Sequence, residues 1–448
     1  MNKRIFALTV ALGLASGLAA PGAQAIPAFA RQTGQNCNAC HVSFPELTPY
    51  GRYFKLSGYT LGKPISAYPE DVPLAVMAVV GVSDTRKNTL SDGTTQVDPY
   101  NGKVKAQQLS LFLGGKATDH LGAFMQWTAA PNPDTGGYDF GADNADIRLV
   151  NTRVAPGGQE PDLIYGLTVN NNPTVQDVWN TVPAWGFPYM ASGTSITGPY
   201  ASPMIENLAG TAGVGGYVYW KQSIYAELSA YRTADGLLSF FNVGNDHVYV
   251  QGYNPYWRLA YSKDWGPDSM EVGTYGMVAD VYPDPVGTGP TGPTDRFKDY
   301  GVDAQYQHIT DLNTWTAQAS YTHETEDWNA SFATLGATSN ATDTLNNFKV
   351  KGSYWYRHKY GASLGYFSST GSSDATLYGG AGSLNDKPDS AGYVFEADYM
   401  PWDYVRLAAQ YNAYTKYLGG STYDDQAGGA PRNASDNNSL FLYVWVAY

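Results

Sequence analysis

The chain has 448 residues with 27 Lys or Arg against 40 Asp or Glu, which gives a formal net charge of −13 at pH 7. This acidic balance argues against a nucleic-acid-binding protein, because such proteins need a basic surface for the phosphates. Charged residues make up only 15% of the chain, whereas it contains 36 Tyr, 11 Trp and 49 Gly. Chains of this composition are typical of β-structure with aromatic girdles.

The first 25 residues have the pattern of a secretory signal peptide. Lys3 and Arg4 precede an apolar run from Ile5 to Leu18, and Ala23-Gln24-Ala25 matches a small-x-small cleavage site. A membrane anchor is the alternative, but the run is shorter than the ~20 residues that span a bilayer. We therefore predict export and cleavage after this site. No later stretch is long and apolar enough for a transmembrane helix.

The only two cysteines lie in Cys37-Asn38-Ala39-Cys40-His41, which fits the C-x-x-C-H attachment motif for a c-type haem. In that motif two thiols bind the vinyl groups of the porphyrin, and the adjacent histidine becomes the proximal iron ligand. Cys37 and Cys40 are thus candidates for covalent haem attachment, and His41 is the candidate ligand of the haem iron. A disulfide or a thioredoxin-like redox pair is the alternative. A zinc site lacks further ligands in the same segment.

The segment that carries this motif, residues 26–70, predicts a short helix. Thr48, which precedes a proline, is typical of an N-cap, and Gly58 is typical of a helix end. Arg52 and Lys55 either pair with haem propionates or lie on a solvated face. The segment has no Met and no second His for the sixth iron position. It is also too short to enclose a haem alone, so it needs walls from the rest of the chain.

Residues 71–448 contain sixteen short stretches in which apolar and polar residues alternate. Trp315 and Tyr321, for example, share one face of a strand while Thr316 and Gln318 share the other. The predicted strands are 72–83, 104–118, 121–131, 143–154, 162–170, 212–221, 223–233, 254–264, 269–281, 297–308, 313–323, 345–358, 360–369, 390–400, 403–416 and 437–448. The pattern predicts an all-β fold with about sixteen antiparallel strands.

The predicted connections alternate between short and long without exception. Short ones include 221–222 and 401–402, and long ones include 234–253 and 417–436. A transmembrane β-barrel has this asymmetry, with short periplasmic turns and long external loops, whereas a soluble sandwich has no reason for it. An even strand number leaves both barrel ends on the periplasmic side. The last strand, 437–448, alternates up to a C-terminal aromatic residue, as a final outer-membrane strand does.

The lumen of a sixteen-stranded barrel is too wide for the wall's own side chains to fill. We therefore expect the N-terminal segment to enter the lumen from the periplasmic side. The longest loop, 171–211, carries Trp179, Trp185, Phe187 and Tyr189. We expect this loop to fold inward and to line or plug the pore, with a cap over the outer loops as the alternative.

Several other residues are candidates for binding the iron or a second metal ion. The candidates for the sixth iron ligand are His120, His308 and His358 at periplasmic strand ends, His247 and His323 at outer ends, and Met77, Met190 and Met204. The iron could instead be five-coordinate or water-bound. The run from His323 to Asp327 begins a predicted outer loop and either holds a divalent cation or is simply solvated. An acidic outer rim, which would concentrate cations or only aid solubility, comprises Asp134, Asp139, Asp143, Asp424 and Asp425.

The stretch FARQTGQNCNACHVSFPELTPYGRYFKLSGYT, followed by an aromatic barrel, resembles the fused monohaem c-type cytochrome–porin family of iron-oxidising bacteria and related extracellular electron-transfer proteins. The specific part of the likeness is this stretch, and the barrel is similar mainly in pattern. The resemblance implies a single c-type haem bound by Cys37, Cys40 and His41 within the barrel. It also implies electron movement between the cell exterior and periplasmic carriers. It implies no particular sixth ligand.

These observations predict three domains: a signal peptide (1–25), a monohaem cytochrome c segment (26–70) and an outer-membrane barrel (71–448). We expect an electron-transfer protein of the bacterial outer membrane rather than a conventional enzyme. It would pass electrons between an extracellular donor or acceptor, such as Fe²⁺, and periplasmic cytochromes. The alternative is a diffusion porin whose haem segment is a plug or sensor. A peroxidase-type haem enzyme ranks third, because no distal His/Arg pair lies beside the motif.

Overall fold

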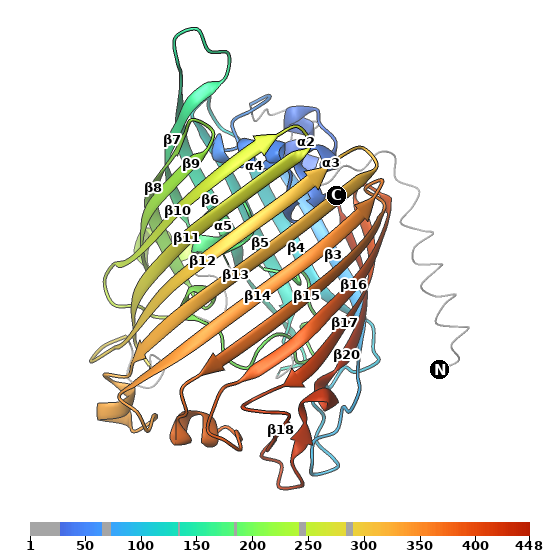
Figure 1. The fold of residues 1–448 in the computed structure, drawn as a ribbon, viewed down its shortest axis with the longest axis vertical. Helices are drawn as coiled ribbons and strands as arrows, with labels where there is room; N and C mark the ends of the chain where they lie inside the picture. The colour runs from blue at the N-terminus through green and yellow to red at the C-terminus, as the bar shows by residue number, and fades with distance from the viewer. Residues whose placement is uncertain (1–26, 65–72, 133–134, 183–185, 242–247, 284–289) are drawn as a thin grey trace.

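The computed structural model of the protein describes residues 27–64, 73–132, 135–182, 186–241, 248–283 and 290–448. The predicted signal peptide, Asp134, Trp185 and His247 lie outside these residues. Sixteen antiparallel strands form a closed barrel (Figure 1), which confirms the predicted fold class. The barrel closes where β20 (Ser439–Ala447) pairs with β3 (Leu74–Thr85).

Each remaining barrel strand pairs with its neighbours in chain order. These strands are β4 (Lys105–Lys116), β5 (Leu121–Pro131), β6 (Tyr138–Val154), β7 (Pro161–Asn170), β8 (Thr211–Trp220), β9 (Ile224–Thr233), β10 (Asn254–Trp265), β11 (Asp268–Val281), β12 (Asp295–Ile309), β13 (Asn313–Asp327), β14 (Thr342–Tyr356), β15 (Tyr360–Gly371), β16 (Ser390–Trp402) and β17 (Val405–Lys416). All sixteen predicted strands are therefore present, most of them within a few residues of the predicted bounds.

The connections and the N-terminal segment contain short elements. In the N-terminal segment these are α2 (Pro27–Thr33), α3 (Cys37–Cys40), β1 (His41–Ser43), β2 (Glu46–Leu47) and α4 (Pro49–Leu56). Those in the loops are α5 (Pro173–Gln176), η3 (Met204–Glu206), η4 (Gly236–Phe241), η5 (Ser331–Leu335), η6 (Ala375–Gly379), β18 (Thr422–Tyr423), β19 (Arg432–Asn433) and η7 (Ala434–Asn437). Within the described ranges, no helix is long and apolar enough to span a bilayer.

The barrel strands present apolar side chains outward and polar side chains to the lumen. In β13, Trp315 and Tyr321 are 52% and 41% exposed, whereas Thr316 and Gln318 are buried on the opposite face. A soluble barrel has the reverse arrangement, while a transmembrane barrel needs an apolar outer face against lipid. The barrel therefore spans a membrane, and its architecture is that of the bacterial outer membrane.

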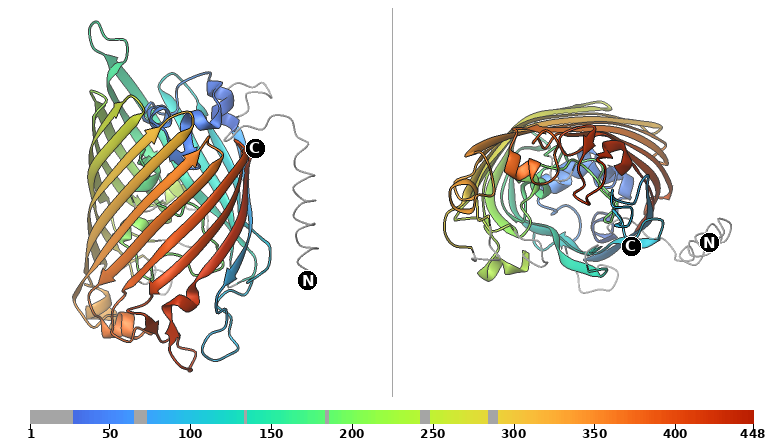
Figure 2. Two further views of the ribbon diagram at one scale, coloured as in Figure 1. Left: turned by 45° about the vertical axis from the view of Figure 1, so that its right-hand side comes forward. Right: turned by 90° about the horizontal axis from the view of Figure 1, so that it is seen from below.

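The two ends of the barrel differ in their connections. The turns 221–223, 310–312 and 403–404 are short and lie at one end, together with the C-terminus and the helices α2, α3 and α4 (Figures 1 and 2). The opposite end carries long loops such as 417–438. The N-terminal segment therefore lies at the short-turn end of the barrel.

One connection departs from the predicted alternation. The strand β6 begins at Tyr138 instead of residue 143, so the loop 132–137 is no longer than the turn 155–160. The residues Tyr138–Ala142 include Gly and Asp, which have low strand propensity, but their pairing with β5 overrides that preference. The prediction of strict alternation is wrong at this connection. The hairpin formed by β6 and β7 extends beyond the barrel rim (Figure 1).

The orientation of the barrel can be tested by cysteine labelling. Leu237 is 95% exposed in a long loop, and Gln222 lies in a short turn. We expect Leu237→Cys to react with a membrane-impermeant thiol reagent on intact cells, because long loops face outward. Gln222→Cys should react only after the outer membrane is permeabilised. The wild-type chain is the control for its own cysteines, and the reverse labelling pattern would invert the proposed orientation.

Candidate functional site

The Cys-x-x-Cys-His motif forms a single helical turn followed by a short strand. The helix α3 spans Cys37–Cys40, and His41 is the first residue of β1. Positions i and i+3 of a helix share a face, so the two cysteines lie side by side. Cys37 is buried and Cys40 is partly buried. Burial, together with the neighbouring Cys37, raises the pKa of Cys40 to about 11, so its thiol is neutral at pH 7.

The helix α4 is attached to this turn by its N-cap residue. Thr48 accepts a hydrogen bond from the Gly51 amide (3.2 Å) and donates one to the Ala39 carbonyl (2.6 Å). A Cβ atom on Gly51 would lie 2.2 Å from the Cys40 carbonyl oxygen, so only glycine permits this contact. Gly58 follows the helix with a φ of 65°. The predicted cap and the predicted helix end are both confirmed.

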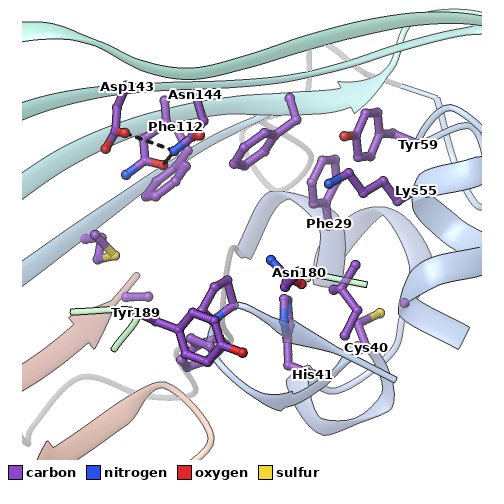
Figure 3. A pocket seen from close by; sticks show the side chains of 18 of the residues that line it. Phe29, Cys40, His41, Lys55, Tyr59, Phe112, Asp143, Asn144, Asn180 and Tyr189 are labelled. Atoms are coloured by element: carbon purple, nitrogen blue, oxygen red, sulfur yellow. Dashed lines mark hydrogen bonds between the residues drawn. The ribbon is translucent and has the colours of Figure 1, made fainter. Parts of the chain in front are cut away.

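A cavity of about 550 Å³ lies beside the motif. Figure 3 shows Cys40 and His41 in its lower part, with Phe29, Tyr59 and Phe112 above them. Other residues that line its apolar part are Cys37, Phe44, Phe54, Met77, Phe124 and Trp445. The cavity is within the usual size range of pockets for small molecules and cofactors.

The remainder of the cavity is polar. Asn180 and Tyr189 of the loop 171–210 between β7 and β8 (the luminal loop) contribute amide and hydroxyl groups. Gln126 and Asn144 of the barrel wall contribute further amides. Asp143 also lines it and accepts hydrogen bonds from Thr128 and Gln108 at 2.7 and 3.2 Å. The expectation that Asp143 belongs to an acidic outer rim is therefore wrong, because β6 is longer than predicted. Two other residues of that rim, Asp424 and Asp425, lie in the loop between β17 and β20.

His41 lines the cavity and is partly buried. Its Nδ1 atom makes no hydrogen bond to any part of the chain that the structure describes. Burial lowers the pKa of His41 to about 4, although the backbone carbonyls of Pro45 and Glu46 act in the opposite direction. The imidazole is therefore neutral at pH 7, which is the form that binds metal ions.

The turn between β1 and α4 contacts the barrel wall through a buried ion pair. Glu46 is fully buried and accepts a hydrogen bond from the Lys351 ammonium of β14. Gln307 of β12 donates to the Glu46 carboxylate at 3.4 Å, and Tyr189 of the luminal loop does so at the same distance. Burial disfavours the charged carboxylate, but Lys351 holds the pKa of Glu46 below its ordinary value. This cluster joins the N-terminal segment, the luminal loop and the barrel.

Arg52 also faces the barrel wall. Its guanidinium donates to Gln307 at 2.6 Å and to Gln305 at 3.2 Å, and it contacts Ser269. The hypothesis that Arg52 pairs with a haem propionate is therefore wrong, because Arg52 does not line the cavity and its guanidinium already donates to the barrel wall. Lys55, in contrast, lines the cavity.

Lys55 is buried, and its Nζ atom donates to the Asp177 carbonyl at 2.8 Å. Burial lowers the pKa of Lys55 to about 8, an effect that the nearby Arg148 guanidinium increases and the surrounding carboxylates oppose. The ammonium therefore remains mostly protonated at pH 7. It brings a positive charge to a largely apolar wall.

The end of α4 contacts β6 and β8. The Tyr59 hydroxyl donates to Asp146 at 2.7 Å, and Asp146 also pairs with Arg148 at 2.7 Å. The Tyr217 hydroxyl donates to the Leu56 carbonyl at 2.7 Å. These partners were not among the sequence-predicted site residues. The sequence feature that could have indicated them is a charged residue at a lumen-facing strand position, as at Asp146 and Arg148. Strand alternation alone, however, does not predict which residue contacts such a side chain.

The loop 171–210 folds into the lumen, as expected. Trp179 is buried, and its carbonyl accepts hydrogen bonds from Gln305 and Gln318 of the barrel wall at 2.7 and 2.9 Å. At the start of the loop, Asp177 forms an ion pair with Arg258 of β10 at 3.3 Å. The loop is therefore attached to the inner wall through buried polar contacts.

Most of the other candidate iron ligands do not reach the cavity. His120 and His358 lie in turns at the barrel rim, and His308 hydrogen bonds to Asp268 at 2.8 Å. Met204 packs in a separate apolar cluster, and Met190 lies in the apolar cluster of the motif without lining the cavity. Met77 does line the cavity.

The run from His323 to Asp327 is not a loop, because β13 extends through Asp327. Strand alternation places Glu324 and Glu326 on the buried inner face and His323 on the other face. These side chains therefore do not converge on one ion. Within the described part of the chain, no group of three or more His, Cys, Asp and Glu side chains is arranged to hold a metal ion.

Comparison with known proteins identifies similar solved structures only. No protein-family profile and no curated protein matches the sequence. Similar structures include Salmonella typhi OmpF in complex with daunomycin (12% identity, TM-score 0.47), covering 84% of this chain and 97% of that one. An anion-selective porin from Comamonas acidovorans has 12% identity and a TM-score of 0.45, with coverage of 84% and 98%. The outer-membrane channel DcaP of Acinetobacter baumannii has 13% identity and a TM-score of 0.47, with coverage of 84% and 96%.

Proposed function

We propose that the chain is an outer-membrane electron-transfer protein that carries one c-type haem beside Cys37, Cys40 and His41. The observation that supports this most directly is that all three side chains line one cavity of about 550 Å³. Aromatic side chains such as Phe29, Phe112 and Trp445 line the same cavity, which suits a flat, apolar porphyrin. A disulfide or a dithiol redox pair would not need such a cavity.

The residues present fit a c-type haem. Cys37 and Cys40 would bind its vinyl groups as thioethers, and His41 would bind its iron through the neutral imidazole. Bound there, the haem would supply reversible one-electron exchange. Phe29 and Phe112 would exclude water from its faces. Lys55 would offer its buried ammonium to a propionate, since a charge-assisted pair is stronger in a low-dielectric wall.

The proposed partners lie on the two sides of the membrane. The motif is at the short-turn end of the barrel, where a periplasmic cytochrome or another carrier would approach. An extracellular donor or acceptor, such as Fe²⁺, would approach from the long-loop end. The luminal loop contributes Asn180 and Tyr189 to the cavity wall. Carboxylates of the outer loops, such as Asp424, would attract cations.

Electron transfer across a vesicle membrane tests this function. The full-length, haem-matured protein is reconstituted into vesicles that enclose a soluble oxidised c-type cytochrome, and Fe²⁺ is added outside. We expect the enclosed cytochrome to become reduced, because the bound haem links the two compartments. Vesicles with the Cys37→Ala/Cys40→Ala protein serve as the control and should show only the leak rate. Equal rates in both preparations would contradict the proposal.

A diffusion porin is the second candidate, and the barrel itself favours it. Sixteen strands enclose a lumen wide enough for an aqueous channel. Planar-bilayer conductance distinguishes the two candidate functions. In an electron-transfer protein, the inward-folded loop and the N-terminal segment should obstruct the lumen, so little ion current is expected. High steady conductance with no electron transfer would favour the porin. Peroxidase activity has less support, because no arginine and no second histidine is found among the described residues that line the cavity.

A further inference from the structure

The N-terminal segment offers the proposed haem no second histidine and no methionine for the sixth iron position. His41 is the only histidine in residues 26–70, and that segment contains no methionine. A histidine or methionine ligand at that position must therefore come from the barrel wall or from the luminal loop. The structure limits the choice, because a ligand has to share the cavity with the motif.

In the described ranges, only one methionine and no second histidine line the cavity that contains the motif. Among the residues that line the cavity, His41 is the sole histidine and Met77 is the sole methionine. Met190 and Met400 are buried in the same apolar cluster as Cys37 but do not line the cavity. Met77 therefore differs from methionines of similar burial in that it lines the cavity.

The surroundings of Met77 suit a soft, neutral metal ligand. Its side chain is 6% exposed and lies at an inward-facing position of β3. It packs in the apolar cluster that also contains Cys37, Phe112 and Trp445. A thioether needs no hydrogen-bond partner when it is buried, so it can occupy an apolar wall without a desolvation cost.

We propose that the Met77 Sδ atom is the sixth ligand of the haem iron; this inference rests on the proposed function. A barrel residue would then complete the coordination begun by the N-terminal segment. Thioether ligation raises the reduction potential of a c-type haem relative to ligation by water or by a second nitrogen. The barrel wall would thereby set the potential as well as enclose the cofactor.

Lys55 is the competing nitrogen ligand in the same cavity. Its amine already donates to the Asp177 carbonyl and is mostly protonated at pH 7, and an ammonium group has no lone pair for iron. A buried amine that loses its proton above that pH would become a competitor. The test therefore includes a Lys55 variant as well as methionine variants.

Spectroscopy of the purified full-length haem protein tests the proposal. The oxidised wild type should show the near-infrared sulfur-to-iron charge-transfer band at pH 7 by absorption or magnetic circular dichroism. Met77→Leu, which nearly conserves volume, should lose this band and lower the reduction potential. It should also bind added imidazole at least about tenfold more tightly, because no internal ligand has to be displaced. Met400→Leu is the matched control and should retain the wild-type band and affinity.

Four results would overturn the assignment. A haem-bearing wild type without the sulfur band would reject Met77 and leave the proposed function intact. The same holds if Met77→Leu retains the band, or if Lys55→Gln alone changes the coordination at pH 7. A wild-type chain that attaches no haem would reject the proposed function together with this inference. The wild-type spectrum decides the question even if Met77→Leu fails to fold.

Discussion

Replacing both motif cysteines by alanine, Cys37→Ala/Cys40→Ala, is expected to abolish covalent haem attachment completely. The two thioethers are the only covalent bonds that the motif offers to a porphyrin, so no single remaining contact can resist denaturation. The barrel should still assemble, because the closing contact between β20 and β3 involves neither cysteine. Haem staining after denaturing electrophoresis measures attachment, and heat-modifiable migration measures barrel folding.

The wild-type protein and one neighbouring variant provide the controls for that experiment. Asn38 lies between the two cysteines and is exposed, so Asn38→Ala should retain full attachment. The denatured wild type should give a pyridine haemochrome of c type. Wild-type haem that extracts into acid acetone would show that the motif has another role. Haem that stays attached to the double variant would point to the same conclusion.

Replacing Lys351 by methionine is expected to give the largest loss of stability at the contact between the N-terminal segment and the barrel. Lys351 is the cation paired with Glu46, and both side chains are buried. Removing one partner of a buried ion pair typically costs about 3–5 kcal/mol, because it leaves an uncompensated charge. Hydrogen exchange and limited proteolysis of residues 41–56 should report release of the segment while the barrel remains folded.

A second substitution distinguishes this electrostatic effect from lost packing. Lys351→Met/Glu46→Gln removes both charges and should recover most of the lost protection, since no isolated carboxylate remains. Arg153→Met is the control, because it breaks an exposed ion pair with Asp162 whose expected contribution is about 0–1 kcal/mol. Equal effects of Lys351→Met and Arg153→Met would contradict the buried-pair explanation.

The same ion pair predicts a pH dependence for the attachment of the segment. Lys351 holds the pKa of Glu46 below its ordinary value of 4.5. A depressed carboxylate pKa contributes stability that is fully present above the unfolded value and is lost as the pH falls through the folded value. The wild-type segment should therefore be released on acidification below about pH 4.5. Glu46→Gln should weaken this acid dependence, measured by the proteolysis assay.

The strands could be predicted from the sequence because alternation is a local property, and the proposal of haem attachment likewise rests on a local motif. Apolar and polar residues alternate along a strand, as at Trp315 and Thr316, because successive side chains face lipid and lumen in turn. In a membrane the apolar face is the outer one, but the period of two residues is the same as in a soluble barrel. The spacing of Cys37, Cys40 and His41 predicts haem attachment without knowledge of the fold, and this stays a prediction. The prediction of strand bounds is wrong where the strand propensity of the residues is weak, as at the start of β6.

The tertiary structure alone decided which residues meet inside the lumen. Glu46 and Lys351 are more than three hundred positions apart, and they pair only after the barrel has closed with its particular register. The same applies to Met77, which shares a cavity with His41 because of where β3 lies in the ring. It also applies to Arg52, whose contacts are with β11 and β12. Local patterns determine secondary structure, whereas contacts in an enclosed lumen are set by closure and by the order of strands around it.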